Sequence, residues 1–178
     1  FNVKWNKSLT NIQGGGFTAI IRRGNQTYQL KAVKVTTLGV TPANGTTPAT
    51  AIFTSGNATL TTFNPITGIT TTWASNANLT IEISDVCEPG GGSNVSSDLI
   101  GITLKDSKGA LLYSNNWDGS KTVKQPLNGG NLQIHNDANT PAPICSSSLN
   151  TVASLKNDMP TSTKPVISND LIKNPDLN

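Results

Sequence analysis

Residues 49–86 read ATAIFTSGNATLTTFNPITGITTTWASNANLTIEISDV, and this stretch decides the fold class. Apolar and polar residues alternate through three regions, 49–63, 68–75 and 77–86, as expected of half-buried β-strands. Asn64-Pro65, together with the Thr-Gly pair that follows, breaks the pattern between the first two regions. Because threonine is β-branched and favours strands, the abundant threonines strengthen this prediction.

The flanking segments continue the strand pattern on both sides. Residues 17–40 predict a hairpin whose turn is Gly24-Asn25, and residues 99–135 predict further strands separated by short turns. No segment of about a dozen residues shows a 3.6-residue apolar period. We therefore predict an all-β fold, an antiparallel β-sandwich of Greek-key or jelly-roll type over residues 14–136, with extended N- and C-terminal arms.

The two arms differ from this body. In residues 1–13, FNVKW alternates Phe1, Val3 and Trp5 with polar residues, which predicts a strand, and Gly14-Gly15-Gly16 after it predicts a flexible joint. Residues 137–178 are polar and rich in proline, which is typical of an extended tail.

Composition limits the class of protein. A chain of 178 residues is long enough for one domain with a real core. Only 13% of its residues are charged, yet nothing resembles a membrane span. A single Met, two Cys and a start without Met are typical of an exported chain whose signal peptide has been removed. We expect an extracellular or cell-surface location.

Charge is distributed unevenly along the chain. The net charge is +3, and no Asp or Glu precedes Glu82. This asymmetry predicts either an unevenly charged solvated surface or head-to-tail attraction between copies. The basic residues are not interleaved with stacking aromatics, so we expect no nucleic-acid partner.

The catalytic residue types do not form a recognisable pattern. His135 is the only histidine, and alternation places it with Gln133 on the face opposite Leu132 and Ile134. No Ser-His-Asp, Cys-His or paired-acid arrangement is visible, so we expect no enzyme activity. Three tryptophans could line a sugar-binding face or serve as core or interface anchors: Trp5, Trp73 and Trp117.

Two cysteines and three acidic residues in or beside predicted loops suggest a disulfide and a metal site. Cys87 and Cys145 predict one disulfide in an exported chain, with an entropic contribution of about 4 kcal/mol, although two free buried thiols are the alternative. Asp85, Glu88 and Asp98 surround a Gly-rich loop and offer the oxygen ligands that Ca²⁺ prefers. They equally suit the capping of backbone N–H groups, in which case no cofactor is needed.

Six Asn-x-Ser/Thr sequons are possible glycan acceptors, although a chain rich in Asn and Thr produces such triplets by chance. Their asparagines are Asn6, Asn25, Asn44, Asn57, Asn78 and Asn94.

Several motifs between residues 52 and 135 resemble those of a known group of proteins. They are GNATL at 56–60, DVCEPG at 85–90 with Asp98, IGITL at 100–104, SNNWDG at 114–119 and GGNLQIH at 129–135. In this order they resemble a β-rich module of large secreted and surface proteins of Bacteroidetes-type bacteria. The resemblance implies a cell-surface or extracellular location and does not imply catalysis. Cys87 and the C-terminal arm depart from the pattern.

These observations predict a structural protein. We expect a subunit of an extracellular filament or surface layer, a homo-oligomer or polymer joined by strand addition. The donor residues are expected in the arms: Phe1, Val3 and Trp5, or Val166, Ile167, Leu171 and Ile172. Arms that fold back onto their own domain are one alternative. An adhesin or carbohydrate-binding module that contacts surface glycans is another.

Overall fold

The structure, a computed structural model, describes residues 1–44, 47–64, 66–86, 98–128, 130 and 132–135, and the backbone of residues 166–167. This part of the chain contains strands and turns without a helix, and every pairing of its strands is antiparallel. The predicted all-β antiparallel fold is therefore confirmed. Within the described residues, no helix is long and apolar enough to cross a membrane.

The strands form two sheets. The smaller contains β1 (Val3–Trp5) and β2 (Ile12–Gly14), and the larger has the order β11-β9-β8-β7-β6-β4-β3, with β5 on β6 and β10 on β8. Their bounds are β3 (Phe17–Arg23), β4 (Gln26–Ala32), β5 (Thr37–Thr41), β6 (Ala49–Phe63), β7 (Thr70–Asp85), β8 (Leu99–Lys105), β9 (Leu111–Ser114), β10 (Gln125–Pro126) and β11 (Val166–Ile167).

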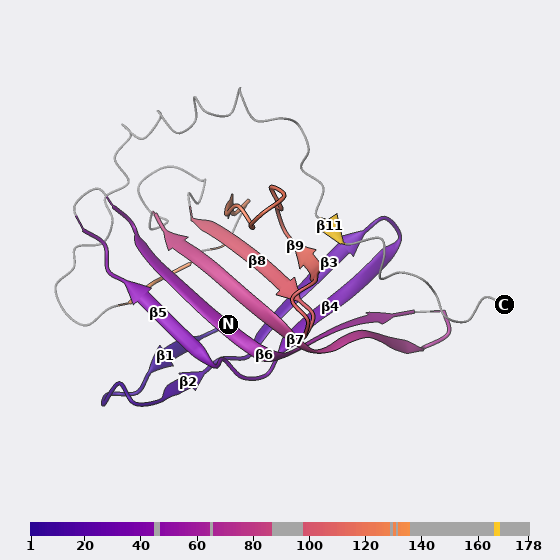
Figure 1. The fold of residues 1–178 in the computed structure, drawn as a ribbon, viewed down its shortest axis with the longest axis horizontal. Coiled ribbons are helices and arrows are strands. Elements are labelled where there is room, and N and C mark those ends of the chain that lie inside the picture. Colours follow the sequence, from indigo (N-terminus) through magenta and orange to yellow (C-terminus); the bar gives the residue numbers. More distant parts are fainter. Residues whose placement is uncertain are drawn as a thin grey trace, which may run out of the picture.

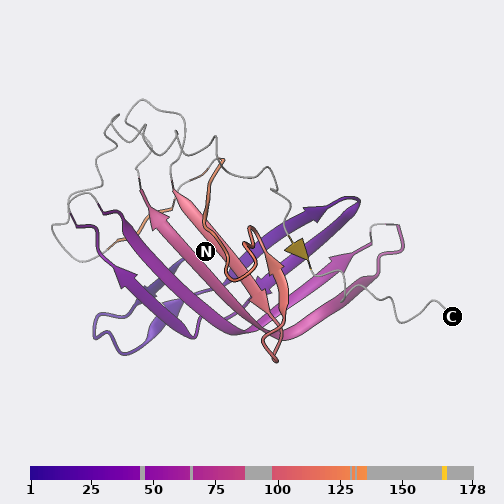
Figure 2. The same ribbon diagram turned by 45° about the horizontal axis from the view of Figure 1, so that its top comes forward.

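The larger sheet is curled, and its two halves run in different directions (Figures 1 and 2). β6 pairs with β5 through residues 50–54 and with β4 through residues 58–62, so one long strand serves both halves. Between them, the register of β6 and β7 shifts from Ser55 to Thr61. Such bulges bend a strand and increase its twist, which curls the sheet at this line.

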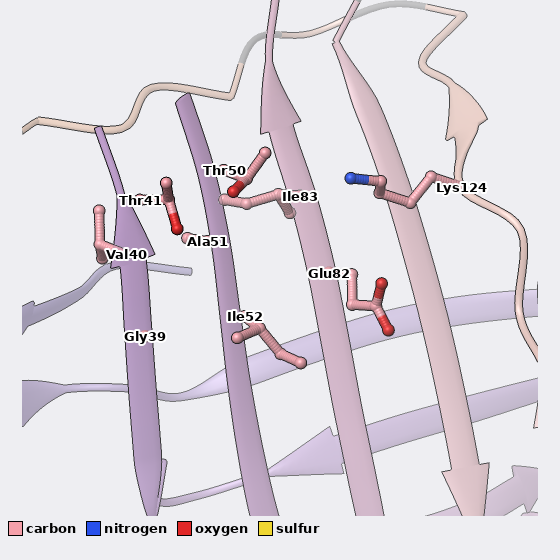
Figure 3. Close-up of a pocket in the computed structure, with 9 residues that line it drawn as sticks. All are labelled: Gly39, Val40, Thr41, Thr50, Ala51, Ile52, Glu82, Ile83 and Lys124. Carbon is pink, nitrogen blue, oxygen red and sulfur yellow. The ribbon is translucent and has the colours of Figure 1, made fainter. Parts of the chain in front are cut away.

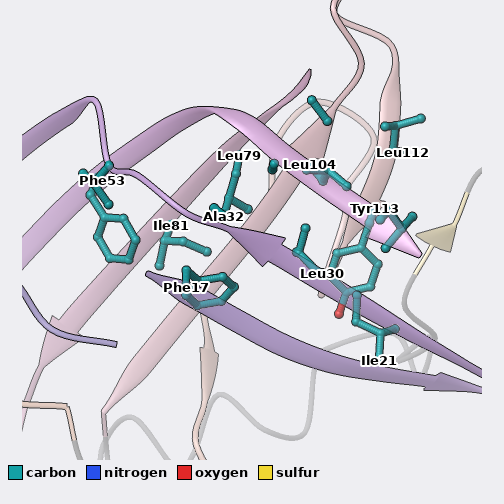
Figure 4. Close-up of a cluster of buried hydrophobic side chains, with 14 of the residues drawn as sticks. Phe17, Ile21, Leu30, Ala32, Phe53, Leu79, Ile81, Leu104, Leu112 and Tyr113 are labelled. Carbon is teal, nitrogen blue, oxygen red and sulfur yellow. The ribbon is translucent and has the colours of Figure 1, made fainter. Parts of the chain in front are cut away.

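The core lies between the two halves. Residues that alternate along β3 and β4, among them Phe17 and Leu30, face Leu79, Ile81 and Leu104 of β7 and β8 (Figure 4). This packing is sandwich-like, as predicted. The order of the strands from β6 to β9 follows the chain, however, so these strands form a meander where a Greek-key or jelly-roll arrangement was expected.

Two local predictions differ from the structure. Residues 68–75 and 77–86 were expected to form two strands, but β7 runs through both, with Asn76 at a φ of 52°. Residues 132–135 were expected to form a strand and have no strand partner in the described part of the chain. The hairpin turn at Gly24-Asn25 is confirmed, since Arg23 pairs with Gln26 across it.

Candidate functional site

The N-terminal arm lies against its own domain. β1 pairs with β2, and the ring of Phe1 contacts the rings of Phe17 and Phe53 at centroid distances of 5.7 and 5.2 Å. Val3 packs against the core, whereas Trp5 is exposed. The alternative in which this arm folds back is the arrangement found here, and donation of the arm to a neighbour stays a prediction.

The glycines after the arm form a tight turn where a flexible joint was predicted. Gly14 and Gly15 have φ values of 77° and 105°, which favour glycine. A Cβ on Gly14 would stand 2.4 Å from the carbonyl oxygen of Asn2, and one on Gly15 would stand 3.0 Å from Val35 Cγ2. The amide of Gly15 donates to the same Asn2 oxygen at 2.8 Å. These contacts direct the N-terminal hairpin onto the domain.

The C-terminal arm supplies a strand to the far end of the larger sheet. β11 pairs antiparallel with β9, with Val166 opposite Ser114 and Ile167 opposite Tyr113 (Figure 1). Two of the predicted donor residues are thus strand residues, paired within their own chain. Leu171 and Ile172 lie outside the described residues.

A second edge of the sheet is the N-terminal half of β7. β8 pairs with β7 only from Asn78 to Ser84, so Thr70–Ala77 has β6 on one side and, among the described strands, no partner on the other. The hairpin that precedes this edge exposes Phe63, Ile66 and Ile69 to 58%, 93% and 60%. Sequence reasoning missed this edge, although a signal was present: residues 35–81 contain no Asp, Glu, Lys, Arg or His.

The outer face of the sheet carries a shallow trough of about 370 Å³ (Figure 3). Its floor includes a row across neighbouring strands, in which Gly39 pairs with Ile52 and Ile52 with Glu82. Lys124 forms one wall, and its Nζ donates to Ser84 Oγ at 2.6 Å. The remaining lining residues are Val40, Thr41, Thr50, Ala51 and Ile83.

The wall of the trough depends on a glycine in the neighbouring strand. A Cβ on Gly101 would lie 3.2 Å from Lys124 Cγ and 3.5 Å from Thr122 Cγ2. The missing side chain lets the segment before β10 cross closely over β8. The trough therefore presents a carboxylate, an ammonium group and threonine hydroxyls, without an aromatic ring among its lining residues.

Two of the predicted calcium ligands cap backbone N–H groups, the alternative that the sequence also offered. Asp98 is fully buried, and its Oδ1 and Oδ2 accept hydrogen bonds from the amides of Val86 and Leu132 at 3.0 and 2.8 Å. Asp85 is buried too, and its Oδ2 accepts from the amide of Ile134 at 2.8 Å. These bonds join residues of two motifs of the resemblance, the one at 85–90 with Asp98 and the one at 129–135.

Calcium remains untested by these contacts. Glu88 lies outside the described residues, and the described part contains no group of three or more His, Cys, Asp or Glu side chains suited to a metal. Cys87 and Cys145 also lie outside the described residues, so the disulfide stays a prediction.

The segment that follows β9 is a polar turn cluster. Ser114 is fully buried, and its Oγ lies 2.8 Å from Thr122 Oγ1, which lies 2.6 Å from Thr103 Oγ1. Asn115 Oδ1 accepts a hydrogen bond from the amide of Ile102, and its Nδ2 donates to the carbonyl of Ile100. This side chain thus makes the two bonds that the main chain of a neighbouring strand would make to β8. These contacts are structural, and this stretch is a closing element of the sheet.

Two residues of catalytic type in this region, Asp118 and His135, lie at the surface. Hydrogen bonds from the backbone amides of Lys121 and Ser120, and from the Ser120 hydroxyl, hold the pKa of the exposed Asp118 below its ordinary value. His135 is exposed, on the face predicted from alternation. Neither side chain lines the trough.

The three tryptophans have separate surroundings. Trp73 Nε1 donates to Thr62 Oγ1 at 3.1 Å, and its ring lies 6.3 Å from that of Tyr28. Trp117 is half-buried, with Lys105 Nζ 5.8 Å from its ring centroid. Trp5, Trp73 and Trp117 come from different elements and their rings do not contact one another, which favours their interpretation as packing anchors.

Most sequon asparagines are at the surface. Those that are exposed are Asn25, Asn44, Asn57 and Asn78, whereas Asn94 lies outside the described residues. Asn6 differs, because its Oδ1 accepts from the amides of Thr10 and Asn11, so its side chain serves the turn between β1 and β2. Glycosylation stays a prediction at all six.

No family model matches the sequence, and no curated protein or solved structure shows a significant match to this chain. The class of this protein is thus assigned from its own strand pairing, which is all-β and antiparallel. The resemblance to bacterial surface modules stays a prediction.

Proposed function

We propose that the chain is a structural subunit of an extracellular filament or surface layer, whose copies join by strand addition at the β9 edge. The observation that carries the proposal is the β11–β9 pair, in which the C-terminal arm already adds a strand to this sheet. Strand addition binds through main-chain hydrogen bonds, so β11 of a neighbour would make the same bonds to β9.

The length of the arm supports exchange between copies. Residues 136–165 separate the body from β11, and a fully extended segment of that length spans about 100 Å. Because β11 has only two residues in register with β9, few bonds need to break for it to leave. The effective concentration of a tethered strand falls as its tether lengthens, from about 1 mM for short tethers, so crowded copies compete with the chain's own strand.

The extracellular location in this proposal is supported by composition. The chain has few charged residues, two cysteines and many threonines and asparagines. The motif resemblance to secreted modules agrees with this location.

Electron microscopy of the full-length protein over a range of concentrations tests the proposal. We expect wild-type filaments or sheets, and discrete particles for Val166→Pro, because proline removes a donor and disfavours strand pairing. Val152→Pro, in the segment between the body and β11, is the matched control and should still assemble. Discrete wild-type particles at every concentration, or assemblies unaffected by Val166→Pro, would contradict strand exchange.

The trough supports a second candidate function, a module that binds surface glycans. Glu82, Lys124 and the threonines beside them offer acceptors and donors on an open sheet face. A glycan array with the wild type tests this function, and Glu82→Gln should reduce any signal. Lys31→Met, on the exposed surface of β4, serves as the control. Binding that survives both substitutions would place the glycan elsewhere.

A further inference from the structure

The β7 edge lacks the charged residues and proline that often protect an exposed strand. Natural edges carry charged residues or proline, or are covered. From Ile69 to Ala77 there is neither, and the sequence is rich in threonine, which favours strands. Thr70, Thr71 and Thr72 pair with β6 without a register shift, so the strand is regular over these three residues, and the first bulge follows at Trp73.

The hairpin beside this edge presents apolar side chains in an organised turn. Asn64 Oδ1 accepts hydrogen bonds from the amides of Ile66 and Thr67 at 2.9 and 3.3 Å, and the amide of Gly68 donates to the Asn64 carbonyl at 2.8 Å. These bonds organise the turn around Ile66, which is 93% exposed.

We propose that the outer edge of β7 at Thr70–Thr72 is a self-association site, occupied by the same edge of a second copy. Antiparallel pairing about a two-fold axis at Thr71 would place Thr70 of each copy opposite Thr72 of the other. The interface is self-complementary, as an isologous dimer requires, and joins two curled sheets into one. The interface does not use β11, so it can be tested separately from strand exchange.

Charge and geometry favour a second copy over other occupants. The unpaired N–H and C=O groups of an edge are satisfied by an extended chain and not by a lipid surface. The chain has a net charge of +3, and pairing of two β3 edges would place Arg22 and Arg23 of both copies in one interface. The β5 edge is also uncharged, but β1 contacts β5. Among the strand edges that the structure describes, only the β7 edge combines neutrality, exposure and an apolar neighbour.

This contact would complement strand exchange. An isologous interface closes after two copies and yields a dimer, whereas head-to-tail exchange of β11 continues without limit. Together they would build a filament whose repeating unit is a β7-joined dimer.

Light scattering with size-exclusion chromatography of the full-length chain tests the proposal. To limit strand exchange, the comparison is made in a Val166→Pro background. We expect a concentration-dependent dimer, and a dissociation constant raised at least about tenfold by Thr71→Lys, which places like charges opposite each other in the interface. Ile20→Lys, on the exposed β3 edge, is the matched control and should leave dimerisation unchanged.

Hydrogen exchange identifies the edge. We expect peptides that cover residues 68–74 to gain protection as the concentration rises, while β3 peptides do not. A monomer at every concentration up to about 1 mM would overturn the proposal, as would a dimer unaffected by Thr71→Lys. Binding to lipid vesicles that Ile66→Asn abolishes, without any dimer, would replace it with a membrane contact.

Discussion

The Oδ2 atom of Asp98 accepts a hydrogen bond from the amide of Leu132 at 2.8 Å, across 34 positions of the chain. Oδ1 of the same carboxylate accepts from Val86. One buried side chain therefore fixes the end of β7, the start of β8 and the segment that closes the core.

Asp98→Asn should destabilise the protein by about 1–3 kcal/mol, because an amide NH₂ would face one of the two N–H donors and leave it unsatisfied. Urea denaturation followed by circular dichroism measures this free energy. Asp106→Asn is the control: Asp106 uses a single oxygen to accept from Lys108 and Ala110, and asparagine retains that oxygen. Equal effects of the two substitutions would contradict this role of Asp98.

Gly15→Ala should destabilise the protein by about 1–3 kcal/mol, since the φ of 105° is strained for alanine and its Cβ would press against Val35. Gly16→Ala is a close control, because a Cβ there has no neighbour within 4 Å. Thermal unfolding compares the two variants. If Gly16→Ala proved as harmful as Gly15→Ala, the tight turn would not be the cause.

Thr122→Val should cost about 1 kcal/mol, because the methyl group that replaces the hydroxyl cannot bond to Ser114 or Thr103. Thr122→Ser keeps the hydroxyl and should recover most of this loss. Chemical denaturation of the three proteins checks the order. A Thr122→Val protein as stable as the wild type would show that the buried hydroxyl chain contributes nothing net.

The carboxyl of Asp118 should titrate below its ordinary pKa when followed by NMR, since three hydrogen bonds favour its charged form. Because the folded-state pKa is lowered, the contribution to stability is present above the unfolded-state pKa and is lost as the pH falls through the folded value. Ser120→Ala removes the hydroxyl donor and should move the pKa upward, whereas Ser107→Ala should not. An unchanged pKa in Ser120→Ala would contradict the assignment.

Local patterns predicted individual elements well. Alternation in residues 49–63 identified β6 and its buried face, and a two-residue Gly-Asn turn identified the β3–β4 hairpin. The same rule placed His135 on the exposed face, although residues 132–135 have no described strand partner. In an extended chain, successive side chains point to opposite faces whatever strand lies beside it. The sequence alone therefore predicts which face a side chain occupies.

Pairing across the fold could not be predicted in this way. Gly14 and Gly15 suggested flexibility, because their close contacts with Asn2 and Val35 exist only after folding. Asp85 and Asp98 suited either a metal site or backbone capping, and the sequence could not identify their amide partners, which lie 49 and 34 residues away.

By itself, the sequence determined that this chain is all-β, which faces of its strands are apolar, and that residues 35–81 carry no ionisable charge. Only the tertiary structure decided that β8 leaves half of β7 uncovered, that β11 lies on β9 and that the N-terminal hairpin folds back. The physical reason is that an edge is a property of strand pairing. Alternation is set residue by residue, whereas pairing depends on how segments far apart in the chain pack on one core.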